Sequence, residues 1–83
     1  MEDKFSNVSD KETLDFYKQI SKKVKYLRQS KNISQLEIAL NIGFKTDAFY
    51  NRCENNTDDK HFNLEHLYKI AKFLNVEIDY FFN

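Results

Sequence analysis

The chain has 83 residues, the size of one small domain, and its 13 basic and 13 acidic side chains give a formal net charge of zero. Apolar residues make up 41% of the chain, including 8 Phe and 5 Tyr, so the composition favours a packed core over disorder. One glycine and no proline favour helices over a sheet with tight turns, and no apolar run approaches the roughly 20 residues of a membrane span.

The first helix is expected to begin at the capping-box sequence from Ser9 to Glu12 and to run to about Ser30. Apolar residues then recur at helical spacing and are expected to face the core: Phe16, Ile20, Val24 and Leu27. Asn32 tolerates the left-handed conformation that ends a helix. Residues 1–8 are expected to form a flexible tail.

The second helix is expected to begin at a second capping box, Ser34 to Glu37, and to end at Ile42-Gly43. Gly43 is the only glycine and suits a turn that needs a positive φ. A third helix is then expected from Lys45 or Thr46 to about Cys53. Its expected inward-facing residues are Phe44, Ala48, Phe49 and Cys53.

Polar residues from Glu54 to His61 predict a loop, after which Asn63 is a good N-cap for a fourth helix. The apolar stripe of that helix predicts its end at Asn75, and a short fifth helix is expected over residues 76–82, with Phe81 and Phe82 in the core. The chain is therefore predicted to be one all-α domain over residues 1–83.

Charge is unevenly distributed along the neutral chain. Residues 1–15 hold five acids and two lysines, residues 18–31 hold six basic side chains and no acid, and residues 32–83 hold eight acids and five basic side chains. The central block is either a local positive patch or an ordinary solvated helix face.

Two segments carry a family resemblance. Residues 24–55 read VKYLRQSKNISQLEIALNIGFKTDAFYNRCEN, and residues 62–82 read FNLEHLYKIAKFLNVEIDYFF. The order of helix signals in these segments resembles the phage-repressor class of helix-turn-helix DNA-binding domains, the Cro and lambda-repressor-like proteins. The residues at matching positions are Ser34-Gln35, Ala39, Gly43 and Leu74-Asn75-Val76. The resemblance implies a compact five-helix domain with an extended first helix. It also implies a cytoplasmic, repressor-like transcription regulator that binds double-stranded DNA, typically as a homodimer and without a cofactor.

In that architecture the third helix lies in the major groove and the second crosses the DNA backbone. The side chains expected to face DNA are Gln35, Lys45, Thr46, Asp47, Tyr50, Asn51, Arg52 and Lys60. Asn51 has the chemistry to read adenine, Thr46 to meet a base edge or a thymine methyl, and Lys45 to bind guanine or phosphate. Gln35, Arg52 and Lys60 are the expected phosphate contacts.

An alternative is a protein-interaction or antitoxin-type module on the same fold with weak or lost DNA binding. Asp58 and Asp59 follow the third helix, where the resembled family usually has basic residues. The pair Glu54-Asn55 also lies one residue later than the usual Glu-Asn pair of that family. Leu36 and Leu40 are expected either to be covered by the first helix, through Leu14 or Tyr17, or to form a partner surface. Tyr80 and Phe73 are candidates for a dimer contact.

Catalytic and metal chemistry have little support in the sequence. Cys53, His61 and His66 are too few and too widely spaced for a structural zinc site. No nucleophile motif or glycine-rich phosphate loop is present. We therefore expect neither an enzyme nor a metal, cofactor or small-molecule substrate. A lone cysteine, an acidic N-terminus without an apolar segment and the lack of a membrane span favour the cytoplasm.

Overall fold

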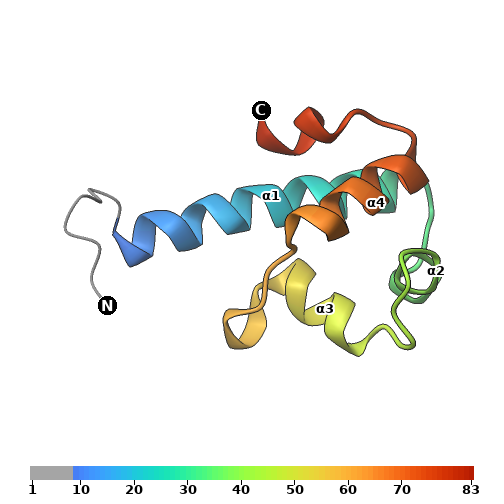
Figure 1. The fold of residues 1–83 in the computed structure, drawn as a ribbon, viewed down its shortest axis with the longest axis horizontal. Helices are drawn as coiled ribbons and strands as arrows, with labels where there is room; N and C mark the ends of the chain where they lie inside the picture. Colours follow the sequence, from blue (N-terminus) through green and yellow to red (C-terminus); the bar gives the residue numbers. More distant parts are fainter. Residues whose placement is uncertain (1–8) are drawn as a thin grey trace.

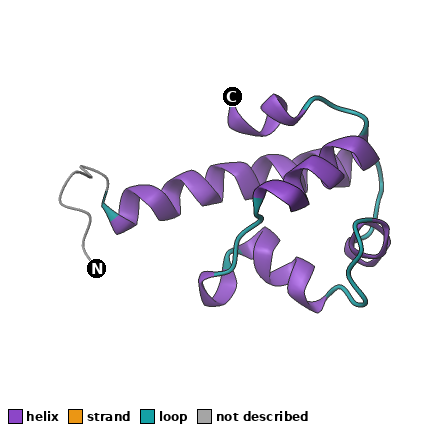
Figure 2. Cartoon of the chain, viewed as in Figure 1, coloured by secondary structure: helices purple, strands orange, loops and turns teal. Residues whose placement is uncertain are grey.

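The computed structural model describes residues 9–83, so the expected tail over residues 1–8 lies outside the described part. Four α-helices and two 3-10 helices make up this part, with no strand among residues 9–83 (Figures 1 and 2). In chain order they are α1 (Asp10–Ser30), α2 (Gln35–Asn41), α3 (Ala48–Asn55), η1 (Thr57–Asp59), α4 (Leu64–Leu74) and η2 (Ile78–Phe82). The predicted all-α class is confirmed, and the expected fifth helix is the 3-10 segment η2.

Helix α1 is the long axis of the domain, and α3, α4 and η2 pack against it (Figure 1). Its N-terminus is where the sequence predicts it, because the Ser9 hydroxyl accepts from the Glu12 amide at 3.1 Å. Its end is also confirmed, since Asn32 adopts a left-handed φ of 59°. The buried positions are Ile20, Ser21, Val24 and Arg28. Phe16 was expected among them, but its side chain is 48% exposed.

Helix α2 begins as predicted, with the Ser34 hydroxyl accepting from the Glu37 amide at 3.0 Å, and Gly43 supplies a φ of 100° in the following turn. The expected start of the third helix at Lys45 or Thr46 is wrong. Residues 45–47 form a bend and α3 begins at Ala48. Ala48, which was expected to face inward, is exposed, and Tyr50 is buried together with Cys53.

Helix α4 is capped by Asn63, whose side chain accepts from the His66 amide at 2.8 Å, and it ends at a left-handed Asn75 with φ 61°. Both boundaries confirm the prediction. In η2, Phe81 is buried, whereas Phe82 is 42% exposed and so not the core residue that was expected.

The core consists of buried side chains from α1, α2, α3, α4, η2 and the segments next to α2 and α4: Ile20, Val24, Ile38, Ala39, Ile42, Tyr50, Cys53, Phe62, Leu67, Ile70, Ala71, Leu74 and Phe81. Leu36 and Leu40 stay 47% and 52% exposed. Tyr17 does not cover them, because its ring stacks on His61 with centroids 3.8 Å apart. The expected cover by the first helix is therefore wrong. No helix within residues 9–83 is both long and apolar enough to cross a membrane.

Candidate nucleic-acid interface

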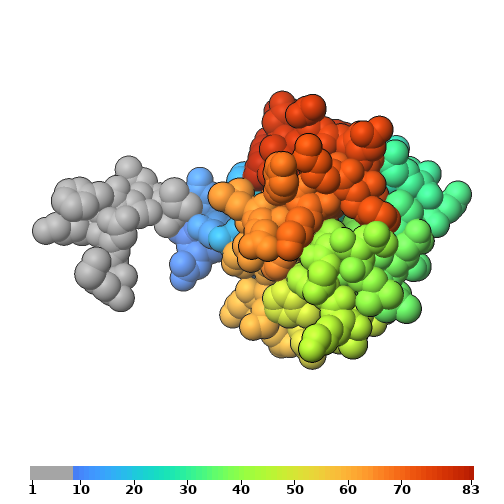
Figure 3. Space-filling view, turned by 45° about the vertical axis from the view of Figure 1, so that its right-hand side comes forward, coloured from blue at the N-terminus to red at the C-terminus, as the bar shows by residue number. Residues whose placement is uncertain are grey.

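The bend after α2 and the outer side of α3 form one exposed polar surface. Its members are Lys45, Thr46, Asp47, Ala48, Asn51, Arg52 and Asn55. In Figure 3, the chain around the bend (yellow-green) lies at the lower edge of the molecule, below α4 (orange). Within the bend the Thr46 hydroxyl accepts from the Ala48 amide at 3.3 Å, which fixes how the chain enters α3. Five of the predicted site residues thus share one surface.

Behind this surface lies a buried ion pair. Arg28 of α1 donates twice to Glu54 of α3, from Nε to Oε2 at 2.9 Å and from Nη2 to Oε1 at 3.0 Å. The two residues are only 7% and 4% exposed. Arg28 also donates from Nη1 to the carbonyl of Ile33, just before α2, at 2.7 Å. One guanidinium therefore ties together α1, the start of α2 and the end of α3.

Tyr50 completes this buried cluster and is not a surface residue. Its hydroxyl donates to Glu54 Oε2 at 2.7 Å, and its side chain is fully buried. Burial, followed by the negative charge of Glu54, raises the pKa of Tyr50 far above its ordinary value. The phenol is therefore a permanent hydrogen-bond donor. The expectation that Tyr50 faces DNA is wrong, because α3 packs with this position turned inward, toward Glu54 and Arg28.

The carboxylate of Glu54 stays charged despite its burial. Burial by itself raises the pKa of Glu54, but hydrogen bonds from Arg28, Tyr50 and Gln35 more than offset that effect, so the net pKa is lowered. The same Arg28–Glu54 hydrogen bonds raise the pKa of Arg28. Both partners are thus ionised at neutral pH.

Gln35 carries this network outward to the exposed face of α3. Its Nε2 donates to Glu54 Oε1 at 3.0 Å, and its Oε1 accepts from Asn51 Nδ2 at 3.0 Å. A side-chain amide has two N–H groups and an oxygen with two lone pairs. Asn51 therefore keeps one N–H and its oxygen for another ligand while Gln35 holds its orientation.

The two remaining predicted phosphate contacts lie near acidic side chains. Arg52 Nε is 3.9 Å from Asp58 Oδ2 in an exposed ion pair. Lys60, at the end of η1, lines a hollow of about 370 Å³ beside the first turns of α1, together with Asp10 and Tyr17. Lys60 is thus separated from Lys45 by the length of α3 and the acidic turn.

The basic block of α1 does not extend across the α3 surface. Ser21, whose hydroxyl donates to the Cys53 carbonyl, and Arg28 mark the side of α1 that faces α3. At about 100° per residue, the exposed Lys18, Lys22 and Lys25 are turned away from that side by roughly 50–110°. These lysines form a neighbouring flank, and Arg28 contributes no surface charge.

The Arg28–Glu54 pair is the functional feature that was not anticipated from the sequence. One signal was present: Arg28 continues the spacing of four from Ile20 and Val24, which places an arginine on the apolar stripe of α1. A charged residue at such a position indicates a buried partner. The identity of that partner, 26 residues further on, required the tertiary fold.

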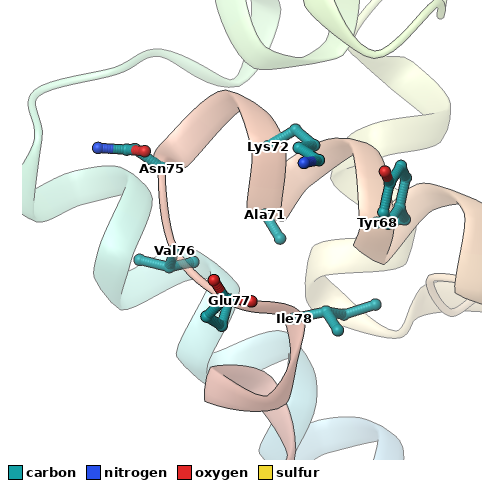
Figure 4. A pocket seen from close by; sticks show the side chains of 7 residues that line it. All are labelled: Tyr68, Ala71, Lys72, Asn75, Val76, Glu77 and Ile78. Carbon is teal, nitrogen blue, oxygen red and sulfur yellow. The ribbon is translucent and has the colours of Figure 1, made fainter.

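A second hollow, of about 290 Å³, lies between α4 and the chain leading into η2 (Figure 4). Ala71, Val76 and Ile78 provide its apolar wall, and Lys72 and Glu77 are its only charged lining residues. Lys72 Nζ lies 5.5 Å from the centre of the Tyr68 ring. This lining contains no nucleophile paired with a base and no set of metal ligands, so we assign it no chemistry.

Comparison with known proteins agrees with this geometry. The family model described as helix-turn-helix matches residues 24–81, which includes α2, the bend, α3, α4 and most of η2. No match was found among curated proteins or among solved structures. The paired helices α2 and α3, joined through Gly43 and backed by the long α1, are the arrangement that the match implies. The chain belongs to the helix-turn-helix family of DNA-binding transcription regulators, in its phage-repressor-like class.

Proposed function

We propose that this protein is a sequence-specific, repressor-like regulator that reads operator DNA with α3 in the major groove and acts as a homodimer. The observation that carries the proposal is the hydrogen-bond chain from Arg28 through Glu54 and Gln35 to Asn51. It holds an exposed amide in a fixed orientation on the outer side of α3. Such preorganisation favours base recognition, because little side-chain freedom remains to be lost on binding.

The exposed residues of this surface have different proposed roles in DNA recognition. Asn51 is the candidate for bidentate recognition of adenine with its free N–H and oxygen. Thr46 and Lys45, which are exposed in the bend, are the proposed contacts to a base edge and to a phosphate. The Asp47 carboxylate can accept a hydrogen bond from the amino group of cytosine but is repelled by phosphates. Its proposed role is therefore to select the base sequence and not to strengthen binding.

The experiment is a fluorescence-anisotropy titration of the full chain against duplexes from upstream of its own gene, at about 50 mM and at physiological salt. We expect saturable, sequence-selective binding that weakens steeply with salt. Lys45→Ala and Asn51→Ala should both weaken binding while leaving the circular dichroism spectrum unchanged. Lys72→Ala is the matched control, since it removes one exposed lysine from α4. Unchanged affinity in both α3-surface variants would exclude this docking face.

A second candidate function is a protein-interaction module, including an antitoxin-type partner. It is favoured by the exposed Leu36 and Leu40 on the outer side of α2 and by the acidic turn after α3. The same titration separates the two functions. Absence of even non-specific binding at about 50 mM salt, where attraction to phosphates is strong, would favour the interaction module.

A further inference from the structure

The outermost line of α3 begins with an apolar residue. Tyr50, Cys53 and Glu54 are buried on one side of the helix. That side faces α1, because the Ser21 hydroxyl of α1 donates to the Cys53 carbonyl at 3.0 Å. At about 100° per residue, Ala48 lies roughly opposite the middle of the three buried positions. Ala48 is exposed, and its methyl group therefore points away from the body of the domain.

The surroundings of Ala48 are polar, and hydrogen bonds fix them. The Ala48 amide donates to the Thr46 hydroxyl at 3.3 Å, which ties the first residue of α3 to the bend. Asn51 follows about one helical turn later and donates to Gln35 Oε1 at 3.0 Å. Asn51 and Arg52, three and four residues after Ala48, are both exposed on the same side of the helix. Ala48 is thus a small apolar spot among side chains that carry hydrogen-bonding groups.

An alanine side chain has only one favourable partner in the major groove. It carries neither a donor nor an acceptor, so a polar base atom pressed against it would lose water without gaining a hydrogen bond. The only apolar group that a base pair presents in that groove is the C5-methyl group of thymine. The residues at the N-terminus of a helix docked in this way contact the base edges, and Ala48 is the first residue of α3.

We propose that Ala48 is a specificity-determining residue that contacts the methyl group of a thymine close to the adenine contacted by Asn51. This inference rests on the proposed function and adds one base to the sequence that the protein selects. Ala48 and Asn51 are about 4.5 Å apart along the helix axis, and successive base pairs are about 3.4 Å apart. The thymine therefore lies within about two base pairs of that adenine.

Replacement of thymine by uracil tests this contact, because uracil lacks only the methyl group. The full chain first selects its tightest duplex from a library of random sequences, and each thymine of that duplex is then replaced singly by uracil. Fluorescence anisotropy gives the ratio of the dissociation constants of the uracil and thymine duplexes. For the wild type, uracil at the proposed position should raise the Kd roughly fourfold, as expected for one buried methyl group. In Ala48→Gly that ratio should fall to about one.

Thr46→Ser is the matched control. It removes a methyl group from the neighbouring bend and retains the hydroxyl that accepts from the Ala48 amide. Its ratio should equal that of the wild type. A loss of folded protein in Ala48→Gly lowers the apparent affinity for both duplexes equally, so the ratio reports on the methyl contact independently of stability.

The outcomes separate this contact from the proposed function. Selective binding with all uracil ratios near one, or a raised ratio that persists in Ala48→Gly, would overturn the thymine contact and leave the proposed DNA binding by α3 in place. A ratio that Thr46→Ser abolishes would assign the methyl contact to the bend and would also overturn it. Lack of selective binding to any duplex would refute the proposed function and this inference with it.

Discussion

Arg28 and Glu54 meet in the interior with a bidentate geometry, at 2.9 and 3.0 Å, although 26 residues separate them in the chain. The pair lies directly beneath the outer surface of α3, and Gln35 connects it to Asn51 on that surface. The same contacts therefore hold α1 against α3 and orient a side chain proposed to read DNA. Stability and the proposed recognition therefore depend on the same carboxylate, that of Glu54.

Replacing Arg28 by methionine should destabilise the domain strongly. The substitution keeps the apolar stem but leaves the carboxylate of Glu54 buried without its countercharge, which typically costs about 3–5 kcal/mol. That is a large part of the roughly 5–15 kcal/mol that holds a small domain together. Urea denaturation followed by circular dichroism measures the loss. Lys25→Met on the exposed side of α1 is the control, with an expected change below about 0.5 kcal/mol. Equal midpoints for the two variants would contradict the structural role of the pair.

Acid should weaken the fold first through His66. Burial lowers the pKa of His66, with the opposing charge of Glu65 too weak to restore it. As the pH falls below about 6.5, the unfolded chain binds a proton that folded His66 resists, so the free energy of unfolding decreases. His66 Nδ1 also accepts from the Asn63 amide at 3.1 Å, and protonation of Nδ1 removes that acceptor.

The test is the variant His66→Gln, because glutamine at this capping-box position still offers an oxygen to the Asn63 amide. Thermal unfolding at about pH 7 and pH 5 should show a smaller loss in the variant than in the wild type. Protonation of Glu54 destabilises the fold at a lower pH than protonation of His66. Since its folded pKa is lowered, its contribution is complete above about pH 4.3 and is lost as the pH falls through the folded value. A wild-type stability that stays constant down to pH 5 would refute the role given to His66.

The helix boundaries that could be predicted from the sequence each have a local cause. Ser9, Ser34 and Asn63 accept from backbone amides three residues on, and Asn32 and Asn75 adopt left-handed conformations that end helices. The start of α3 lacks such a signal, because the Asp47 side chain makes no capping hydrogen bond. Residues 45–47 form a bend instead, so no local capping signal marks the residue at which α3 begins.

The candidate site could be predicted only in part, because it also depends on contacts between residues far apart in the sequence. Lys45, Thr46 and Asn51 are exposed as predicted, whereas Tyr50 lies in the core because α3 packs with this side toward Glu54 and Arg28. Arg28 was grouped with the surface lysines because charge counts do not distinguish faces of a helix. Long-range contacts decided both assignments.

Replacing Gly43 by alanine should destabilise the link between α2 and α3 through the backbone alone. A φ of 100° is unfavourable for any residue with a Cβ, while the nearest atom to an added Cβ is Lys69 Nζ at 3.9 Å, so there is room for a methyl group. We expect a loss of about 1–2 kcal/mol in urea denaturation. Asn32→Gly, at another left-handed position, should cause no loss. A neutral Gly43→Ala would mean that the turn relaxes to a different conformation.

Removing the Gln35 amide should reduce base selectivity more than it reduces stability. In Gln35→Ala, Asn51 remains present but loses the acceptor that orients it. We expect discrimination at one base pair to fall by about 1–3 kcal/mol, close to the effect of Asn51→Ala. Anisotropy titrations with single-base substitutions of the preferred duplex measure this. The double variant should be no worse than Asn51→Ala at that base pair, and additive losses would show that the two side chains act separately.

Neutralising the acidic turn should strengthen DNA binding. Asp58 and Asp59 adopt left-handed conformations with φ of 55° and 59°, which asparagine tolerates well, so Asp58→Asn with Asp59→Asn should preserve the turn. The change frees Arg52 from its 3.9 Å ion pair and removes repulsion between the turn and the DNA phosphates. Affinity at low salt should rise, and one further phosphate contact by Arg52 would steepen the dependence of log K on log salt by about one unit. Asp79→Asn, which neutralises an exposed acid on η2, should leave both quantities unchanged. If both variants bind DNA as the wild type does, the acidic turn lies away from the DNA and α3 enters the groove at an angle that keeps Arg52 clear of the backbone.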